Sequence, residues 1–221
     1  MNLEALLRSF TVATLATCLA GVLGVGAAAL LTRRRSALGD LFDALLTAPM
    51  VLPPTVLGYA LLRLLSRDGA FGSAWEQGVG APLLFSPAAA VLAAAIAALP
   101  LVLRAARAAI DGVDPRLAAA AATLGATPAR VLWSVVLPLA RPGIVAGLTL
   151  GFARALGEFG ITLMIAGNLP GATQTAALAI YDAVQAGRDA EAAGMATLLA
   201  ALATALLLVA TGLGRRRRDG F

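Results

Sequence analysis

The sequence predicts an all-α protein that crosses a membrane several times, and three observations support this fold class. Hydrophobic residues fill 60% of the 221 positions and charged residues only 13%, with a mean hydropathy of +0.87. A soluble domain of this size carries roughly a quarter charged residues. Apolar runs of about 20 residues, enough to cross the hydrocarbon layer as a helix, recur along the chain. Alanine, leucine and glycine dominate these runs, which favours packed helices over barrel strands.

Five apolar segments are long enough to be transmembrane helices, and we expect residues 1–221 to form a single membrane domain. The segments cover about residues 10–31, 41–65, 85–103, 142–165 and 193–213. The first is either a retained helix or a cleaved signal peptide. Signal peptides place positive charge before a shorter apolar core. Here the core is long and Arg33-Arg34-Arg35 follows it, which favours a retained helix.

The arginines predict how these spans are oriented. All 17 Lys+Arg residues are arginine; 12 lie in tracts that this topology places in the cytoplasm, four lie on the outer side, and Arg154 falls inside a span. This bias predicts an outer N-terminus and a cytoplasmic C-terminus. Because the positive charge sits in short tracts between apolar spans, nucleic acid is not expected as a partner.

Three segments interrupt or connect the apolar spans: a proline pair in mid-membrane and two regions expected on the outer side. Pro53 and Pro54 remove two adjacent backbone donors within the second segment, which indicates either a packing kink or a break that lines a pathway. Residues 66–84 are expected to form an external loop with a short interfacial piece at Trp75. Residues 168–186 are polar and rich in helix breakers, so a sixth spanning or re-entrant piece there is possible but disfavoured.

The segment 104–137 is predicted to be a cytoplasmic loop that carries a short helix. Asp114 can cap a helix that begins at Pro115, Gly125 can end it, and Thr127-Pro128 repeats the start signal. A helix of about 10 residues is too short to cross the bilayer. Since it is almost uncharged, we expect it either to adsorb to the membrane surface or to insert into a groove on a partner protein.

This loop resembles the cytoplasmic "EAA" loop of ABC-importer permeases, in which a coupling helix docks in a cleft of the ATPase subunit. The resemblance rests on Gly125, on Val135 ten positions later, and on Leu137-Pro138, with Ala119 where the family usually has glutamate. It implies a type I ABC-importer permease fold. The residues expected to contact the ATPase are Ala119, Ala120, Leu124, Gly125, Ala126, Thr127, Val135, Leu137 and Pro138.

Five further stretches are similar to the molybdate permeases within that family, and sulfate/thiosulfate permeases share much of the pattern. They are residues 49–59, 99–104, 110–114 and 152–160, together with the Asn-Leu-Pro-Gly-Ala-Thr-Gln-Thr run at 168–175, which is closest to the molybdate branch. The resemblance implies a homodimer in a bacterial inner membrane, with the pathway at the dimer interface. It also implies two ATP-binding subunits on the cytoplasmic side and a periplasmic or extracellular oxyanion-binding protein. Molybdate is the expected substrate, with tungstate or sulfate as alternatives.

Residues of the fourth segment suggest where a pathway or gate lies. Arg154 and Glu158 are four positions apart and therefore share one helix face. Charges at membrane depth usually pair or face water, so the two form either a structural pair or part of the pathway. The candidate pathway residues are Pro53, Pro54, Arg154, Glu158, Phe159 and Gly160. Gly143, Gly147 and Gly151 form a bare stripe for close helix contact, within one subunit or at a moving or dimer-lining face.

Composition disfavours the other functional classes. Without lysine the chain cannot carry a P-loop, and with no histidine and one cysteine we expect no metal site, cofactor or catalytic constellation. The chain is therefore not expected to be an enzyme. An ion-coupled secondary transporter would need ionisable residues at several midplane positions, and only Arg154 and Glu158 qualify.

Overall fold

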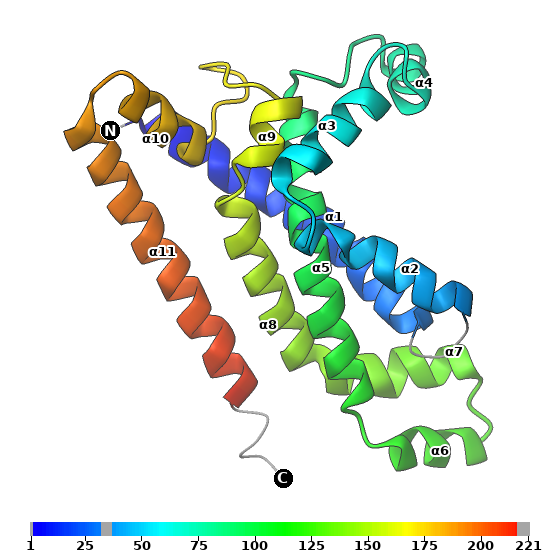
Figure 1. Ribbon diagram of the computed structural model, residues 1–221. Coiled ribbons are helices and arrows are strands. Elements are labelled where there is room, and N and C mark those ends of the chain that lie inside the picture. Colours follow the sequence, from blue (N-terminus) through cyan, green and yellow to red (C-terminus); the bar gives the residue numbers. More distant parts are fainter. Residues whose placement is uncertain (1, 32–36, 216–221) are drawn as a thin grey trace.

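Three long helices form the centre of the protein. The structure, a computed structural model, describes residues 2–31 and 37–215, and each regular element in these ranges is a helix. Helices α1 (Leu3–Leu31), α5 (Pro87–Asp111) and α8 (Leu137–Leu156) pack side by side, and α11 (Asp189–Arg215) lies against α8 and α10 (Figure 1). The shorter elements are α2 (Ala37–Thr47), η1 (Ala48–Met50), α3 (Pro54–Leu65), α4 (Ala70–Val79), α6 (Pro115–Thr123), α7 (Pro128–Val131), η2 (Leu132–Val136), α9 (Gly160–Ile165) and α10 (Ala176–Gln185).

The long helices confirm the predicted all-α membrane fold. Within the described ranges, four helices are long and apolar enough to cross a membrane, and there are five spans if α2 to α3 counts as one broken span. The two halves of that pair meet at 112°. A bend this large is not a kink within a continuous helix. The 10-residue α10 is too short to be the sixth span that was considered for residues 168–186.

Two helix boundaries differ from those expected from the sequence. The third span does not end at Arg104, because α5 continues to Asp111. The residues of this extension are mostly alanine and arginine, which favour helix, and no glycine or proline occurs before Gly112. The helix that contains the fourth span begins before Pro142, since helix runs from Pro128 to Leu156. It then breaks before α9, so the predicted span at 142–165 is two helices.

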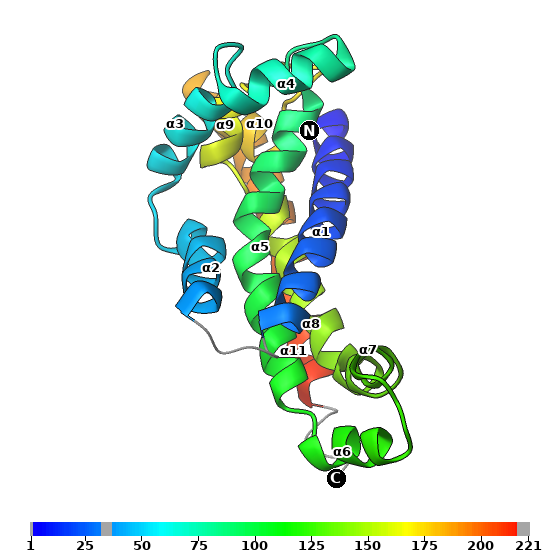
Figure 2. The ribbon, with the colours of Figure 1, turned by 90° about the vertical axis from the view of Figure 1, so that its right-hand side faces the viewer.

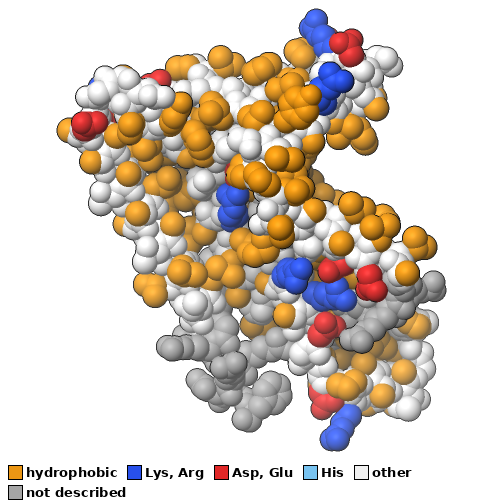
Figure 3. Space-filling view, viewed as in Figure 1, with side chains coloured by type: hydrophobic (Ala, Val, Ile, Leu, Met, Phe, Trp, Pro, Cys, Tyr) orange, Lys and Arg blue, Asp and Glu red, His pale blue; other side chains and the backbone are white. Residues whose placement is uncertain are grey.

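Segments predicted for opposite sides of the membrane lie at opposite ends of the molecule. The start of α1, α4 and α10 are at one end and α6 is at the other, in both Figure 1 and Figure 2. The space-filling view shows apolar side chains distributed over the visible surface between these ends (Figure 3). The arginine tracts 33–35 and 216–218 lie outside the described residues, so which end faces the cytoplasm stays a prediction.

Small residues allow the central helices to approach closely. Alanines of α5 such as Ala93 and Ala98 are fully buried, as are Ala13 and Ala16 of α1. On α8, a Cβ atom added to Gly147 would lie 2.5 Å from Ala105 Cβ. At Gly151 it would lie 2.6 Å from Val102 Cγ2. Two members of the predicted glycine stripe therefore pack against α5 within this chain.

Gly147→Leu is expected to destabilise the protein because the new side chain would displace α8 from α5. Overpacking of this kind typically costs about 1–3 kcal/mol. The matched control is Gly194→Leu in α11, where an added Cβ meets nothing within 4 Å. Thermal unfolding of both variants in detergent, followed by circular dichroism, measures the difference. Equal unfolding midpoints for the two variants would show that the contact at Gly147 is unimportant.

Candidate functional site

The first candidate region is the loop between α5 and α8, whose short helices begin where the sequence predicts. The Asp114 carboxylate Oδ1 accepts a hydrogen bond from the Arg116 backbone N–H at 2.8 Å, and Pro115 is the first residue of α6. Thr127 Oγ1 accepts from the Arg130 N–H at 3.4 Å, and Pro128 begins α7. These caps satisfy amide groups that a free helix end leaves open.

The turn between α6 and α7 presents an apolar side chain to the surroundings. Gly125 has φ +82°, a left-handed conformation that ends α6 and that glycine adopts without strain. The preceding Leu124 is 88% exposed, the highest value among the large apolar side chains described. A shallow cavity of about 300 Å³ opens beside this turn. Its lining includes Leu124, Gly125, Ala126 and Val135, four of the predicted coupling residues.

The remaining predicted coupling residues are not among those that line this cavity. Ala119 and Ala120 are on exposed positions of α6. Leu137 faces a different cavity, which it shares with Cys18 and Val22 of α1. Pro138 follows η2, a π-helical turn, and since proline cannot donate to the carbonyl four residues back, the wider turn accommodates it. Pro138 therefore shapes the helix in this structure.

The second candidate region is the break between α8 and α9, where Arg154 and Glu158 form an ion pair. Arg154 Nη2 lies 2.7 Å from Glu158 Oε2. The Glu158 side chain is 2% exposed and that of Arg154 is 38% exposed. The other carboxylate oxygen, Glu158 Oε1, accepts from the Ile161 backbone N–H at 2.8 Å, at the start of α9. Glu158 thus joins the two helices, through an ion pair on one side and a helix cap on the other.

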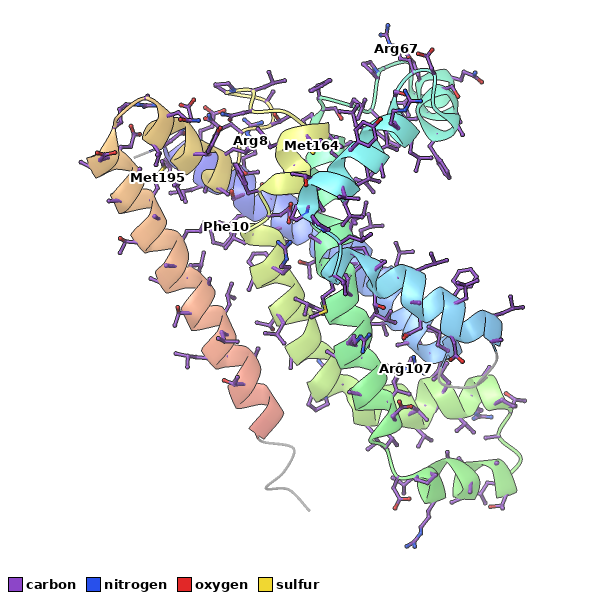
Figure 4. The ribbon with its side chains drawn as sticks, viewed as in Figure 1. Arg8, Phe10, Arg67, Arg107, Met164 and Met195 are labelled. Atoms are coloured by element: carbon purple, nitrogen blue, oxygen red, sulfur yellow. The ribbon has the colours of Figure 1, made fainter. Side chains whose placement is uncertain are left out.

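The structure brings the predicted proline break next to this helix break, although more than 100 residues separate them. A Cβ atom on Gly160 would lie 2.7 Å from Pro54 Cβ, so glycine is required for the approach. One turn further on, Gly58 of α3 faces Met164 of α9, with 2.5 Å between an added Cβ and the sulfur. Figure 4 shows Met164 beside α3. These contacts hold α3 against α9, so that α3 does not continue along the axis of α2.

The remaining two candidate pathway residues flank this contact. Phe159 packs its ring against Tyr181 of α10, with 5.2 Å between the ring centroids. Pro53 is exposed and forms the N-cap of α3. It ends a non-helical stretch, 51–53, that lies about half-way along α5 in Figure 1 and Figure 2. Pro54, Glu158 and Gly160 therefore lie in one region, with Pro53 at its exposed edge.

Two features of these regions were not predicted from the sequence. Asp43 of α2 and Arg107 of α5 form an ion pair with 2.8 Å between Oδ1 and Nη1, and Figure 4 shows Arg107 between the two helices. An acid inside an otherwise apolar segment was the available signal for Asp43. Trp133, between the coupling turn and α8, is 70% exposed. A large aromatic side chain just after a predicted cytoplasmic turn was the corresponding signal.

Curated relatives of the chain are molybdenum transport permeases. The "Molybdenum transport system permease protein ModB" of Haemophilus influenzae is 42% identical over 185 residues, which cover 84% of this chain and 81% of that protein. The protein of the same name from Escherichia coli K12 is 43% identical over 182 residues, covering 82% and 80%. A putative molybdenum transport system permease protein, YvgM of Bacillus subtilis, is 39% identical over 181 residues, covering 82% of this chain and 80% of that protein.

Solved structures show the same fold at lower identity. An inward-facing MetNI methionine ABC transporter superposes with a TM-score of 0.71 at 18% identity, covering 98% of this chain and 94% of that chain. An amino acid ABC transporter superposes with a TM-score of 0.61 at 21% identity, covering 98% and 92%. The family model described as "Binding-protein-dependent transport system inner membrane component" matches residues 20–218. The chain therefore belongs to the family of inner-membrane components of binding-protein-dependent transport systems.

Proposed function

We propose that the chain is the permease subunit of an ABC importer that carries molybdate across the inner membrane, using ATP hydrolysed by a separate subunit. The observation that carries this proposal is the similarity to molybdenum transport permeases, 42% identity over 84% of this chain and 81% of the Haemophilus influenzae relative. Such similarity spans the helices, the coupling loop and the break at 157–159 together. The family description names an inner-membrane component of binding-protein-dependent transport systems, which implies ATP-binding subunits and a substrate-binding protein as partners.

The exposed turn at Leu124 and Gly125 supports an ATP-binding subunit as the partner of the 104–137 loop. Large apolar side chains of this turn and of α6 are exposed, Leu124 by 88% and Leu117 by 46%. A groove on an ATP-binding subunit would cover these apolar side chains as well as the lipid headgroup layer would. It would also connect the loop to ATP-driven movement. In this arrangement α6 and α7 face the cytoplasm, and the start of α1 faces outward.

The irregular backbone at 51–53 supports a second copy of the chain as the neighbour of this face. Val51 is 85% exposed and Leu52 is 41% exposed. Non-helical backbone at membrane depth is stable only where protein covers it or where it lines a water-filled space. In a homodimer with the pathway at its interface, the second copy would cover part of this backbone and the water-filled pathway would solvate the rest. Pro53, Pro54 and the Arg154–Glu158 region then lie beside the route of the anion.

Uptake into proteoliposomes tests the proposal. The permease is reconstituted with its ATP-binding subunits and its binding protein, and radioactive molybdate uptake is measured with ATP or with a non-hydrolysable analogue. We expect uptake with ATP and none with the analogue. Unlabelled molybdate and tungstate should compete with the labelled molybdate more strongly than sulfate does. Uptake of sulfate in place of molybdate would assign the chain to the sulfate branch. Uptake driven by an ion gradient without ATP would contradict the importer mechanism.

A further inference from the structure

Helix α2 is joined to the centre of the protein by few contacts. Its ion pair with α5 links Asp43 Oδ1 to Arg107 Nη1 at 2.8 Å, with the two side chains 25% and 30% exposed. On the other side, an apolar cavity of about 580 Å³ separates α2 from α1 and α5. The stretch 51–53 connects α2 and η1 to α3, which is held separately against α9. Because η1 packs against α5, helix α2 has room to move about its junction with η1, and the Asp43–Arg107 pair is a polar tie between α2 and α5.

Arg107 keeps binding capacity beyond Asp43. A guanidinium group has five N–H donors, and the hydrogen bond to Asp43 uses one of the nitrogens that carry them. Arg104 lies one turn earlier on α5, is exposed, and has no carboxylate within ion-pair distance in the described ranges. Side chains three positions apart on a helix are neighbours, with about 5–6 Å between their Cβ atoms. Two adjacent guanidinium groups are suited to a tetrahedral dianion, whose oxygens accept several charge-assisted hydrogen bonds.

We propose that Arg107, together with Arg104, is a transient site for the transported oxyanion at the cytoplasmic end of the pathway, and that Asp43 competes with the anion for Arg107. This inference rests on the proposed function. When the dianion occupies Arg107, Asp43 is displaced and α2 is released from α5. When Asp43 returns to Arg107, the anion leaves. A permeation site must bind strongly enough to admit the ion and weakly enough to release it. Competition from the Asp43 carboxylate weakens the binding enough for release.

The proposal predicts that removing the competitor strengthens anion binding. Asp43→Asn keeps the size and a hydrogen-bonding oxygen but loses the negative charge. We expect the purified permease–ATPase complex with this substitution to bind molybdate about tenfold more tightly in equilibrium dialysis, and to import it more slowly because release is delayed. Arg107→Gln should lose the binding and most of the uptake. The double variant Asp43→Asn/Arg107→Gln should also lack both, although its neutral side chains can still form a hydrogen bond.

A purely structural ion pair gives a different set of results. Each single variant would then lower stability and uptake, the double variant would recover them, and no variant would change anion binding; that outcome would overturn the proposal. The matched control is Arg67→Gln/Glu76→Gln, which neutralises an ion pair at the opposite end, with 3.2 Å between Nη2 and Oε1. Dialysis is repeated with sulfate, another tetrahedral dianion. If the wild type imports no molybdate but Asp43→Asn still tightens sulfate binding, the proposed substrate fails and the anion site stands.

Discussion

Leu124→Arg is expected to abolish association with the ATP-binding subunit while the chain still inserts into the membrane. Leu124 is 88% exposed, so the substitution does not disturb the packing of this chain. An arginine in its place would carry an uncompensated charge into an apolar groove on the partner, at a cost of several kcal/mol. Affinity purification through a tag on the permease, followed by quantification of the ATPase, measures the loss. We expect at least a tenfold decrease in recovered ATPase.

Two controls separate docking from folding. Leu169→Arg introduces the same charge at a leucine that is 44% exposed at the opposite end of the molecule, and should leave ATPase recovery unchanged. Gly125→Ala tests the turn, since Gly125 has φ +82° and alanine there is strained by about 1–2 kcal/mol. Its match is Gly187→Ala, at φ +68° and also with nothing within 4 Å of an added Cβ. Full ATPase recovery with Leu124→Arg would contradict the docking of this loop.

Arg154→Ala is expected to reduce the amount of folded protein sharply, because it leaves the Glu158 carboxylate buried without its cation. Removing one partner of a buried ion pair commonly costs about 3–5 kcal/mol. Glu158→Gln should cost less. Arg154 is 38% exposed and can turn toward water, while the glutamine oxygen can still accept the Ile161 N–H. Size-exclusion chromatography of the detergent-solubilised variants measures the monodisperse fraction.

The double variant Arg154→Met/Glu158→Leu separates structure from transport. With neither charge present, no carboxylate remains to be neutralised, so the folded fraction should recover relative to Arg154→Ala. Because Glu158 also caps α9 beside Pro54 and Gly160, we expect molybdate uptake by this variant to remain impaired. Full uptake by the well-folded double variant would make the pair purely structural and remove it from the gate.

The long helices could be predicted from the sequence because the hydropathy of each apolar run identifies it as a membrane-spanning helix without reference to the rest of the chain. The starts of α6 and α7 were equally accessible, since Asp114-Pro115 and Thr127-Pro128 are local signals. The 112° angle between α2 and α3 was not accessible. Two prolines indicate that a helix breaks, but its new direction depends on the contact of Gly58 with Met164, far along the chain. The end of α5 was predicted too early because arginine lowers the hydropathy that marks a membrane span. Arginine nevertheless favours helix, so the helix continues beyond the apolar run.

The candidate sites divide in the same way. The Arg154–Glu158 pair follows from a spacing of four residues on one helix. The approach of Pro54 to Gly160 and the pairing of Asp43 with Arg107 join residues from different helices. No local periodicity encodes such contacts. The role of Pro138 also became visible only in three dimensions. This residue follows the π-helical turn and does not line the cavity beside Leu124.

Helix α8 acts mechanically as a connecting rod between the two candidate regions. Helix is continuous from Pro128 to Leu156, but Figure 1 shows α7 at a steep angle to α8, so the rod is the 20 residues of α8, about 30 Å at 1.5 Å per residue. With a pivot at Leu137, a tilt of about 5° moves the far end by about 2.6 Å, from the same rod length. Arg154 lies on that far end, whereas Glu158 lies beyond the break. In the proposed complex, a small movement of the ATP-binding subunit would therefore be enough to lengthen the 2.7 Å contact between the two charges, with the π-helical turn as the compliant joint between α7 and the rod.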